Sequence, residues 1–176
     1  MHKSIGHSLL AAVAVAAATS PCAFAQPYPA KQIRMIVPFP PGGGVDFAAR
    51  VVGKQLAERL GQQVVIDNRP GANGIVGLEI LKLAPADGYT LAVASQGPLS
   101  INPSIYPKLP YDSTKDFAPI SGVVNFPLLL VVHPSLPVKS VPEMIALARK
   151  NPEQLSYSHP GAGNSGHLAG ELFNSM

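Results

Sequence analysis

The chain has 176 residues, of which 47% are hydrophobic and 13% are charged, and this composition is typical of a globular protein rather than a disordered one. Thirteen Lys and Arg residues stand against ten Asp and Glu, with no basic cluster, so neither nucleic acid nor an anionic membrane is an expected partner. The single cysteine excludes an internal disulfide framework.

The first 25 residues have the organisation of a secretory signal peptide. Lys3 supplies a basic start, the run from Leu9 to Ala18 is almost wholly apolar, and Ala23-Phe24-Ala25 is a small-x-small cleavage site. The apolar run is too short for a transmembrane helix, which needs roughly twenty residues. Cys22 raises the alternative of a lipoprotein, but the residues before it lack the small side chains expected at a lipid-attachment site. We therefore expect cleavage after Ala25, a periplasmic mature chain without cysteine, and no direct membrane insertion of that chain.

A strand, a glycine turn and a helix start follow the signal peptide. Residues 31–37 are rich in β-branched side chains, residues 38–46 contain three consecutive glycines, and the helical pattern then extends to Leu60, with Gly61 ending it. Glycine permits positive φ and a close approach of bare N–H groups to a ligand. The unpaired amides and the positive dipole end of the helix suit a carboxylate. The turn lacks the dinucleotide and phosphate-loop patterns, so small carboxylates are favoured over nucleotides.

Asp46 has two possible roles at this helix start. We expect it to be the N-cap, because a carboxylate that faced an anionic ligand would repel it. Direct ligand contact is the alternative.

The succession of a strand, a glycine loop and a helix occurs a second time. Residues 63–67 predict a strand, residues 68–74 a glycine-rich loop, residues 75–83 a helix and residues 89–94 a third strand. This alternation predicts a parallel βαβαβ sheet whose ligands bind outside the carboxyl ends of the strands. Ser95 and Gln96 reach that edge either as neutral hydrogen-bonding groups or as ordinary turn residues. Arg69 is either a partner for a carboxylate or a solvated structural charge.

The composition of the chain changes at Pro98, where the regular alternation of strands and helices ends. Residues 98–119 predict a long irregular connection, of a kind that is often functional or joins two lobes. Residues 120–132 are apolar and predict two strands with a hinge-like break at Asn125-Phe126-Pro127. Ser140 is expected to cap a helix over 141–150, with Pro142 and Glu143 in its first turn. Residues 155–158 predict a short strand, and a third glycine loop then leads to a helix that begins at Ser165 or Gly166.

Catalytic and metal-binding alternatives have little support. Ser165 and His167 are two residues apart on a helix and do not face each other, so they are not expected to act as nucleophile and base. His159 and His167 lack a cysteine or acidic companion at metal-ligand spacing. We expect no enzymatic activity, metal or cofactor.

Six segments carry a distinctive pattern along the chain: PFPPGGGVDFAAR at 38–50, NRPGANGIVG at 68–77, APADGYTL at 84–91, LPYDSTKDFAPI at 109–120, HPSLPVKSVPEMIALARKNPEQLSYS at 133–158 and GAGNSGHLAGELF at 161–173. Taken in this order, they resemble the tripartite tricarboxylate transporter solute receptors, the Bug family of extracytoplasmic binding proteins. The resemblance covers essentially the whole expected mature chain.

This resemblance implies an α/β fold of the periplasmic-binding-protein type (type II), with two lobes, each containing a βα sheet. The lobes would close on a small carboxylated solute for uptake by the membrane components of a transporter or for sensing. Residues 26–125 would form the first lobe and residues 126–176 part of the second, because family members are about twice this mature length. The ligand-binding residues carried over are Phe39, Pro41, Gly42, Gly43, Gly44, Asp46, Ala72, Asn73, Gly74, Ser95, Gln96, Gly163, Asn164, Ser165 and His167.

Two other interpretations stay open at this point: a truncated, non-functional remnant of such a receptor, and an exported enzyme acting on a carboxylate. With an incomplete second lobe we expect at best millimolar binding. Two or three charge-assisted hydrogen bonds of about 1.5–3 kcal/mol each fall short of the about 8 kcal/mol that micromolar affinity requires beyond the cost of association. We also expect apolar residues such as Leu128–Val132 to be exposed and to favour aggregation.

Overall fold

The computed structural model describes residues 27–152, 154–159 and 161–176. The predicted signal peptide and its cleavage site lie outside these described residues. The chain divides into two compact units, Met1–Ala30 and Lys31–Met176, and all the elements below belong to the second. Across the described ranges, no helix combines the length and the apolar content that a membrane crossing requires.

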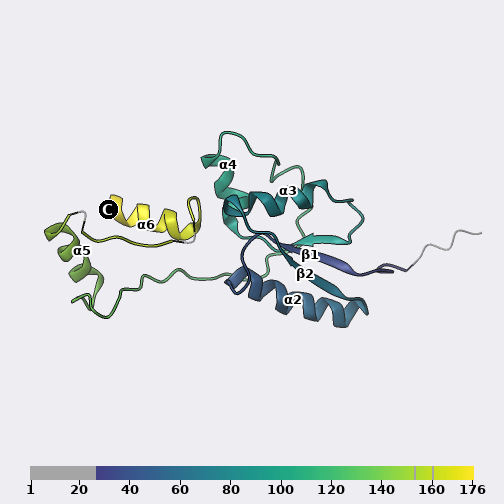
Figure 1. Ribbon diagram of the computed structural model, residues 1–176, viewed down its shortest axis with the longest axis horizontal. Helices are drawn as coiled ribbons and strands as arrows, with labels where there is room; N and C mark the ends of the chain where they lie inside the picture. Colours follow the sequence, from purple (N-terminus) through teal and green to yellow (C-terminus); the bar gives the residue numbers. More distant parts are fainter. Residues whose placement is uncertain (1–26, 153, 160) are drawn as a thin grey trace, which may run out of the picture. The chain divides into compact units, whose positions relative to one another are not determined.

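The second unit contains a three-stranded parallel sheet with the strand order β2-β1-β3 (Figure 1). Its strands are β1 (Ile33–Val37), β2 (Val64–Asn68) and β3 (Thr90–Ala92), each within two residues of the predicted bounds. Val37 pairs with Asn68, and Ile36 pairs with Ala92. The carboxyl ends of all three strands therefore meet at one edge of the sheet, and the glycine loops leave from that edge.

Two helices cover the two faces of the sheet (Figure 1). Helix α2 (Gly44–Leu60) packs against one face and α3 (Ile75–Leu83) against the other. Right-handed crossovers that leave the central strand in opposite directions require this arrangement. Met35 and Val37 of β1 form the core beneath α2 together with Ala49. The predicted βαβαβ unit is therefore present.

Two helix ends have the capping residues predicted from the sequence. Gly61 ends α2 with a φ of 65°, and its N–H donates to Ala57 O at 3.0 Å. Helix α5 (Val141–Lys150) begins after Ser140, whose hydroxyl accepts from the Glu143 N–H at 3.4 Å. The Glu143 carboxylate in turn accepts at 2.8 Å from the N–H of Lys139, the residue before the N-cap, so it bonds one position earlier than in a capping box. The predicted bounds of α3 and α5 are confirmed, and α6 (Ser165–Ser175) begins at one of its two predicted starts.

The connection after β3 is more helical than predicted. It contains η2 (Gly97–Ile101), a π-helical turn, and the short α4 (Asn102–Ile105). The prediction of an irregular connection is wrong for these residues, because the Gly-Pro and Asn-Pro pairs begin helical turns here instead of interrupting them.

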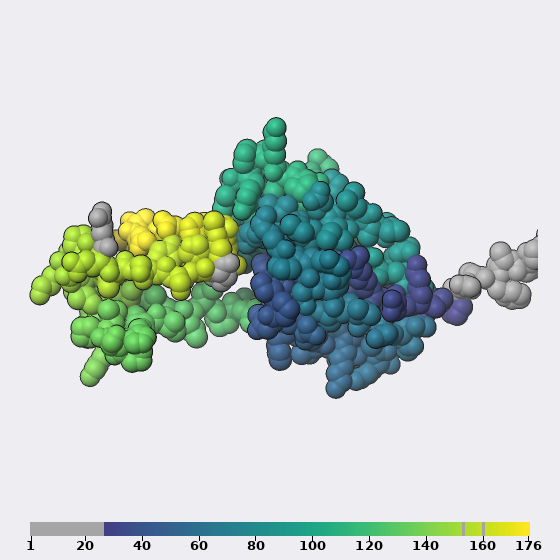
Figure 2. Space-filling view, viewed as in Figure 1, coloured from purple at the N-terminus to yellow at the C-terminus, as the bar shows by residue number. Residues whose placement is uncertain are grey.

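The predicted strands over 120–132 and 155–158 are wrong, because no strand lies beyond Ala92 in the described part of the chain. A strand exists only where a neighbour supplies ladder hydrogen bonds, and these segments have none. The exposure expected at Leu128–Val132 is confirmed: Leu129 is 81% exposed and Val131 80% exposed. Atoms of this green segment are visible at the molecular surface in Figure 2.

Candidate functional site

The carboxyl edge of the sheet collects three loops, which we call the β1 loop (residues 38–44), the β2 loop (residues 69–74) and the β3 loop (residues 93–97). In the order β2-β1-β3, β1 is the central strand: the chain passes from β1 to β2 on one side and then crosses to β3 on the other side. In open α/β sheets, ligands bind outside the strand ends at such a switch point. The candidate site therefore lies at the ends of β1 and β3.

The prediction that Asp46 is the N-cap of α2 is wrong. The helix begins at Gly44, Gly43 is the N-cap residue, and Asp46 is the third residue of the helix. From this position the Asp46 carboxylate reaches back and accepts from the Gly42 N–H at 2.9 Å. The three glycines allow the backbone to enter the helix three residues earlier than the side-chain pattern indicated.

The Asp46 carboxylate is the centre of a buried polar network. Its side chain accepts from Arg50 Nε at 2.9 Å and from Asn68 Nδ2 at 2.9 Å, and the residue is only 3% exposed. Asn68 Nδ2 also donates to Phe39 O at 3.0 Å, so the network joins the β1 loop to the end of β2. Hydrogen bonds from Arg50, Gly42 and Asn68 hold the pKa of Asp46 well below its usual range. Asp46 is therefore a charged anchor of the β1 loop.

This network limits which groups of the β1 loop remain for a ligand. The Gly42 N–H is bonded to Asp46, and the Arg50 guanidinium pairs with the same carboxylate. The backbone N–H groups in the first turn of α2 have no intrahelical acceptor. A side chain at Gly44 would meet Phe126, because a Cβ built there lies 3.4 Å from the Phe126 ring. The first-turn amides of α2 are thus the donors of this loop that have no acceptor within the helix.

The β2 loop has a strained backbone. Gly71, Ala72, Asn73 and Gly74 all have positive φ, with 46° at Ala72 and 50° at Asn73. The Gly74 N–H donates to Gly71 O at 2.9 Å and closes the turn. Asn73 Nδ2 donates to Asn102 Oδ1 at 2.8 Å, and Asn102 Nδ2 donates to Asn73 O at 3.2 Å. Sequence reasoning missed Asn102, because an Asn-Pro pair is a common turn signal with no link to a loop 29 residues away.

The β3 loop supplies a buried hydroxyl with no partner. Ser95 Oγ is the one buried side-chain polar atom among the described residues that lacks a hydrogen bond. A buried hydroxyl left unpaired is destabilising, and such groups in native proteins usually serve a ligand or an ordered water. Gln96 is exposed and directly precedes η2. Of the two predicted residues, Ser95 therefore has the geometry of a ligand donor.

The third glycine loop is held by its own polar groups. The Asn164 side chain caps α6 by accepting from the Gly166 N–H at 2.9 Å, and Ser165 Oγ lies 3.4 Å from the same oxygen. The Gly163 N–H donates to His167 Nδ1 at 3.5 Å. A Cβ built on Gly163 would lie 3.1 Å from Asn73 Nδ2 and 3.4 Å from Asn102 Oδ1, and the φ of 78° at this residue also favours glycine.

The third loop shows no arrangement typical of catalysis or metal binding. The hydrogen-bond partner of Ser165 is Asn164, and the rings of His159 and His167 are 4.6 Å apart. No group of three His, Cys, Asp or Glu side chains with metal-binding geometry is found within the described ranges.

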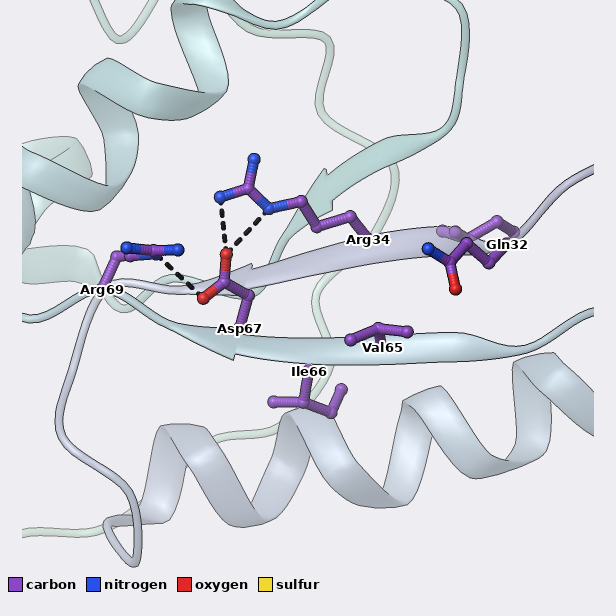
Figure 3. A pocket seen from close by; sticks show the side chains of 7 residues that line it. Gln32, Arg34, Val65, Ile66, Asp67 and Arg69 are labelled. Atoms are coloured by element: carbon purple, nitrogen blue, oxygen red, sulfur yellow. Dashed lines mark hydrogen bonds and ion pairs between the residues drawn. The ribbon is translucent and has the colours of Figure 1, made fainter.

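A cavity of about 240 Å³ lies along β1 and β2 and reaches the first residue of the β2 loop (Figure 3). In Figure 3 the guanidinium groups of Arg34 and Arg69 both point to the Asp67 carboxylate. Arg34 Nε and Arg69 Nε donate to it at 2.8 and 2.9 Å. Burial alone would raise the pKa of Asp67, but the bonds from the two arginines outweigh it and lower the pKa. The Arg69 guanidinium is thus engaged by Asp67 in this fold. The cavity is lined by Gln32, Ile33, Arg34, Val65, Ile66, Asp67 and Arg69.

Comparison with known proteins identifies the family. Residues 48–176 match the profile described as tripartite tricarboxylate transporter family receptor. The chain belongs to this receptor family. The match confirms the resemblance drawn from the six sequence segments. Among similar family receptors is Protein BugT of Bordetella pertussis, which is 41% identical over 169 residues, covering 94% of this chain and 52% of BugT.

Solved structures of similar receptors confirm the periplasmic-binding-protein fold. Rpa4515 of R. palustris, solved with adipate, is 40% identical, with a TM-score of 0.82 over 85% of this chain and 50% of that one. MatC from Rhodopseudomonas palustris, solved with bound malate, is 30% identical, with a TM-score of 0.75 over 84% of this chain and 51% of that one. The family receptors are solute-binding proteins rather than enzymes. This chain spans about half the length of these relatives.

Proposed function

We propose that the chain forms the solute-capturing first lobe, and part of the second, of an extracytoplasmic receptor for a small carboxylated solute. The solute is held between the two lobes and delivered to the membrane components of a tripartite tricarboxylate transporter or to a sensor. Residues 26–125 form the first lobe and residues 126–176 belong to the second. The receptor acts in the periplasm after signal-peptide cleavage following Ala25.

The unpaired Ser95 hydroxyl is the observation that carries this proposal. It is buried at the end of β3, next to the switch point at which α/β sheets bind ligands. The end of β1, its neighbour in the sheet, leads to the first-turn amides of α2, which favour an anion. A carboxylate can accept from both kinds of donor at once.

Neutral donors, rather than cations, recognise the carboxylate in this proposal. Arg34, Arg50 and Arg69 are the basic residues nearest in sequence to the β1 and β2 loops, and each is paired with an aspartate. The adipate and malate bound by two relatives are dicarboxylates, which fit a site with one set of anion-binding amides on each lobe. The ligand-binding residues proposed are those carried over from the family, with Asp46 and Gly42 acting as the internal support of the β1 loop.

An NMR titration of the ¹⁵N-labelled chain with adipate tests the proposal, since it detects binding down to millimolar affinity. We expect saturable shifts at the amides of Gly44, Val45 and Ser95. Adipamide, which has the same length but no charge, is the matched control and should leave these signals in place. Equal responses to adipate and adipamide, or no saturable response to adipate or malate, would contradict the proposal.

A further inference from the structure

We propose that Asn102 is a positioning residue that holds the β2 loop in its ligand-binding conformation through a reciprocal hydrogen-bonded pair with Asn73. The inference deepens the proposed function and rests on it for the identity of the ligand. Asn102 itself is fully buried and does not reach the solute.

The β2 loop needs external support because its backbone is disfavoured for L residues. Ala72 and Asn73 occupy the left-handed region, with φ of 46° and 50°. Asparagine tolerates this region better than most residues, whereas alanine does not. Such strain persists where the surrounding structure fixes the conformation.

The Asn73–Asn102 pair is a two-point contact. Asn102 accepts from the Asn73 side chain at 2.8 Å and donates to the Asn73 carbonyl oxygen at 3.2 Å. One bond orients the side chain and the other orients the peptide plane that follows Asn73. Because that peptide plane carries the N–H of Gly74, the pair also fixes the turn that the Gly74 N–H closes onto Gly71 O. An aliphatic residue at position 102 could make neither bond.

The segment that carries Asn102 is itself firmly packed against the loop. Pro98 of η2 lies against Gly74, since a Cβ there would be 3.0 Å from the Pro98 ring. The Tyr111 hydroxyl donates to Pro98 O at 2.6 Å from a buried position. Gly163 of the third glycine loop leaves room for both asparagines. The η2 and α4 turns thus form a rigid support behind the β2 loop.

Three variants of the full ¹⁵N-labelled chain test the proposal. Asn102→Ala removes both hydrogen bonds of the pair. Asn73→Ala removes only the bond between the two side chains, and it replaces Asn102→Ala as the test if that variant does not fold. Ile33→Val, at the opposite end of β1, is a control that lowers stability without touching the loop. The readouts are hydrogen exchange at the Gly74 amide, the thermal midpoint, and adipate affinity by NMR titration.

We expect Asn102→Ala, which loses both hydrogen bonds, to speed Gly74 exchange by about tenfold or more and to weaken adipate binding about tenfold. Asn73→Ala loses one of the two bonds and should shift both readouts in the same direction by a smaller factor. Ile33→Val should leave both within twofold. Adding Asn73→Gly to Asn102→Ala should recover part of the affinity, because glycine adopts the left-handed backbone without support. Wild-type exchange and affinity in the asparagine variants, or equal losses in Ile33→Val, would overturn the proposal. If adipate fails to bind the wild-type chain, the proposed function fails, whereas Gly74 exchange still decides the role of Asn102.

Discussion

The Asp46 carboxylate accepts a hydrogen bond from the Gly42 N–H at 2.9 Å and so closes the glycine turn onto the first turn of α2. The same carboxylate is neutralised by Arg50, which lies one helical turn further on. An acidic side chain can therefore sit beside an anion-binding helix start, because its charge is directed into the protein. The relationship explains how the loop combines three flexible glycines with a defined backbone.

Asp46→Asn should make the unfolding free energy less dependent on pH in the acidic range. The pKa of Asp46 is lower in the folded chain than the about 3.9 of an unfolded aspartate, so its contribution is present above about pH 4 and is lost as the pH falls through the folded value. We expect the variant to be less stable than wild type at pH 7, with a difference that shrinks below about pH 4. Urea unfolding at several pH values measures this. A difference that stays constant down to about pH 2.5 would contradict the assignment.

Gly77→Ala should destabilise the fold. A Cβ at this position would lie 2.6 Å from Pro38 Cβ and 2.8 Å from Pro38 Cα, where α3 crosses the end of β1. Overpacking of this kind costs typically about 1–3 kcal/mol in unfolding free energy. Gly43→Ala is the matched control, because a Cβ there meets only Pro40 O at 3.9 Å. Equal unfolding free energies for the two variants would show that the approach of α3 to Pro38 is not tight.

Tyr111→Phe should lower the unfolding free energy by about 0.5–1.5 kcal/mol, the net value of a hydrogen bond, since the Pro98 carbonyl loses its buried donor. Tyr157→Phe removes an exposed hydrogen bond to Glu171 and should have the smaller effect. Denaturant unfolding of both variants makes the comparison. The reverse order would mean that Tyr111 does not support η2.

Arg69→Met should leave adipate affinity within about twofold of wild type. The Arg69 guanidinium is bonded to Asp67, so a solute carboxylate would have to compete with that pair. NMR titration at two salt concentrations measures both the affinity and its ionic component. A loss of tenfold or more, together with a strong salt dependence in wild type, would show that Arg69 binds the solute.

Local signals predicted the starts of α3 and α5. Ser140 with Glu143, and the glycine before Ile75, placed the starts of α5 and α3, because caps act through neighbouring backbone groups. Strands depend on hydrogen bonds to partners that lie far away in the sequence. The apolar composition of residues 120–132 favours strands, but no neighbouring strand pairs with these residues, and so they form none. The sequence alone could not reveal that dependence.

The site was predicted in outline and not in its internal bonds. Strand–glycine–helix alternation located the loops and Ser95, because parallel strands bring their ends to one edge. The role of Asp46 depended on where α2 begins, which three glycines leave undefined in the sequence. The Asn73–Asn102 pair joins two loops through side-chain amides, and no periodicity or spacing encodes such a contact.

Adipate titration of wild type, Ser95→Ala and Ser100→Ala tests the central claim, that the edge between β1 and β3 binds a carboxylate, most directly. Ser100 is exposed on η2 and serves as the matched control. We expect Ser95→Ala to weaken adipate binding about tenfold, since a hydrogen bond to a charged group contributes roughly 1.5–3 kcal/mol, while its thermal stability is unchanged or raised. Ser100→Ala should bind as wild type does. Wild-type affinity in Ser95→Ala would contradict the claim.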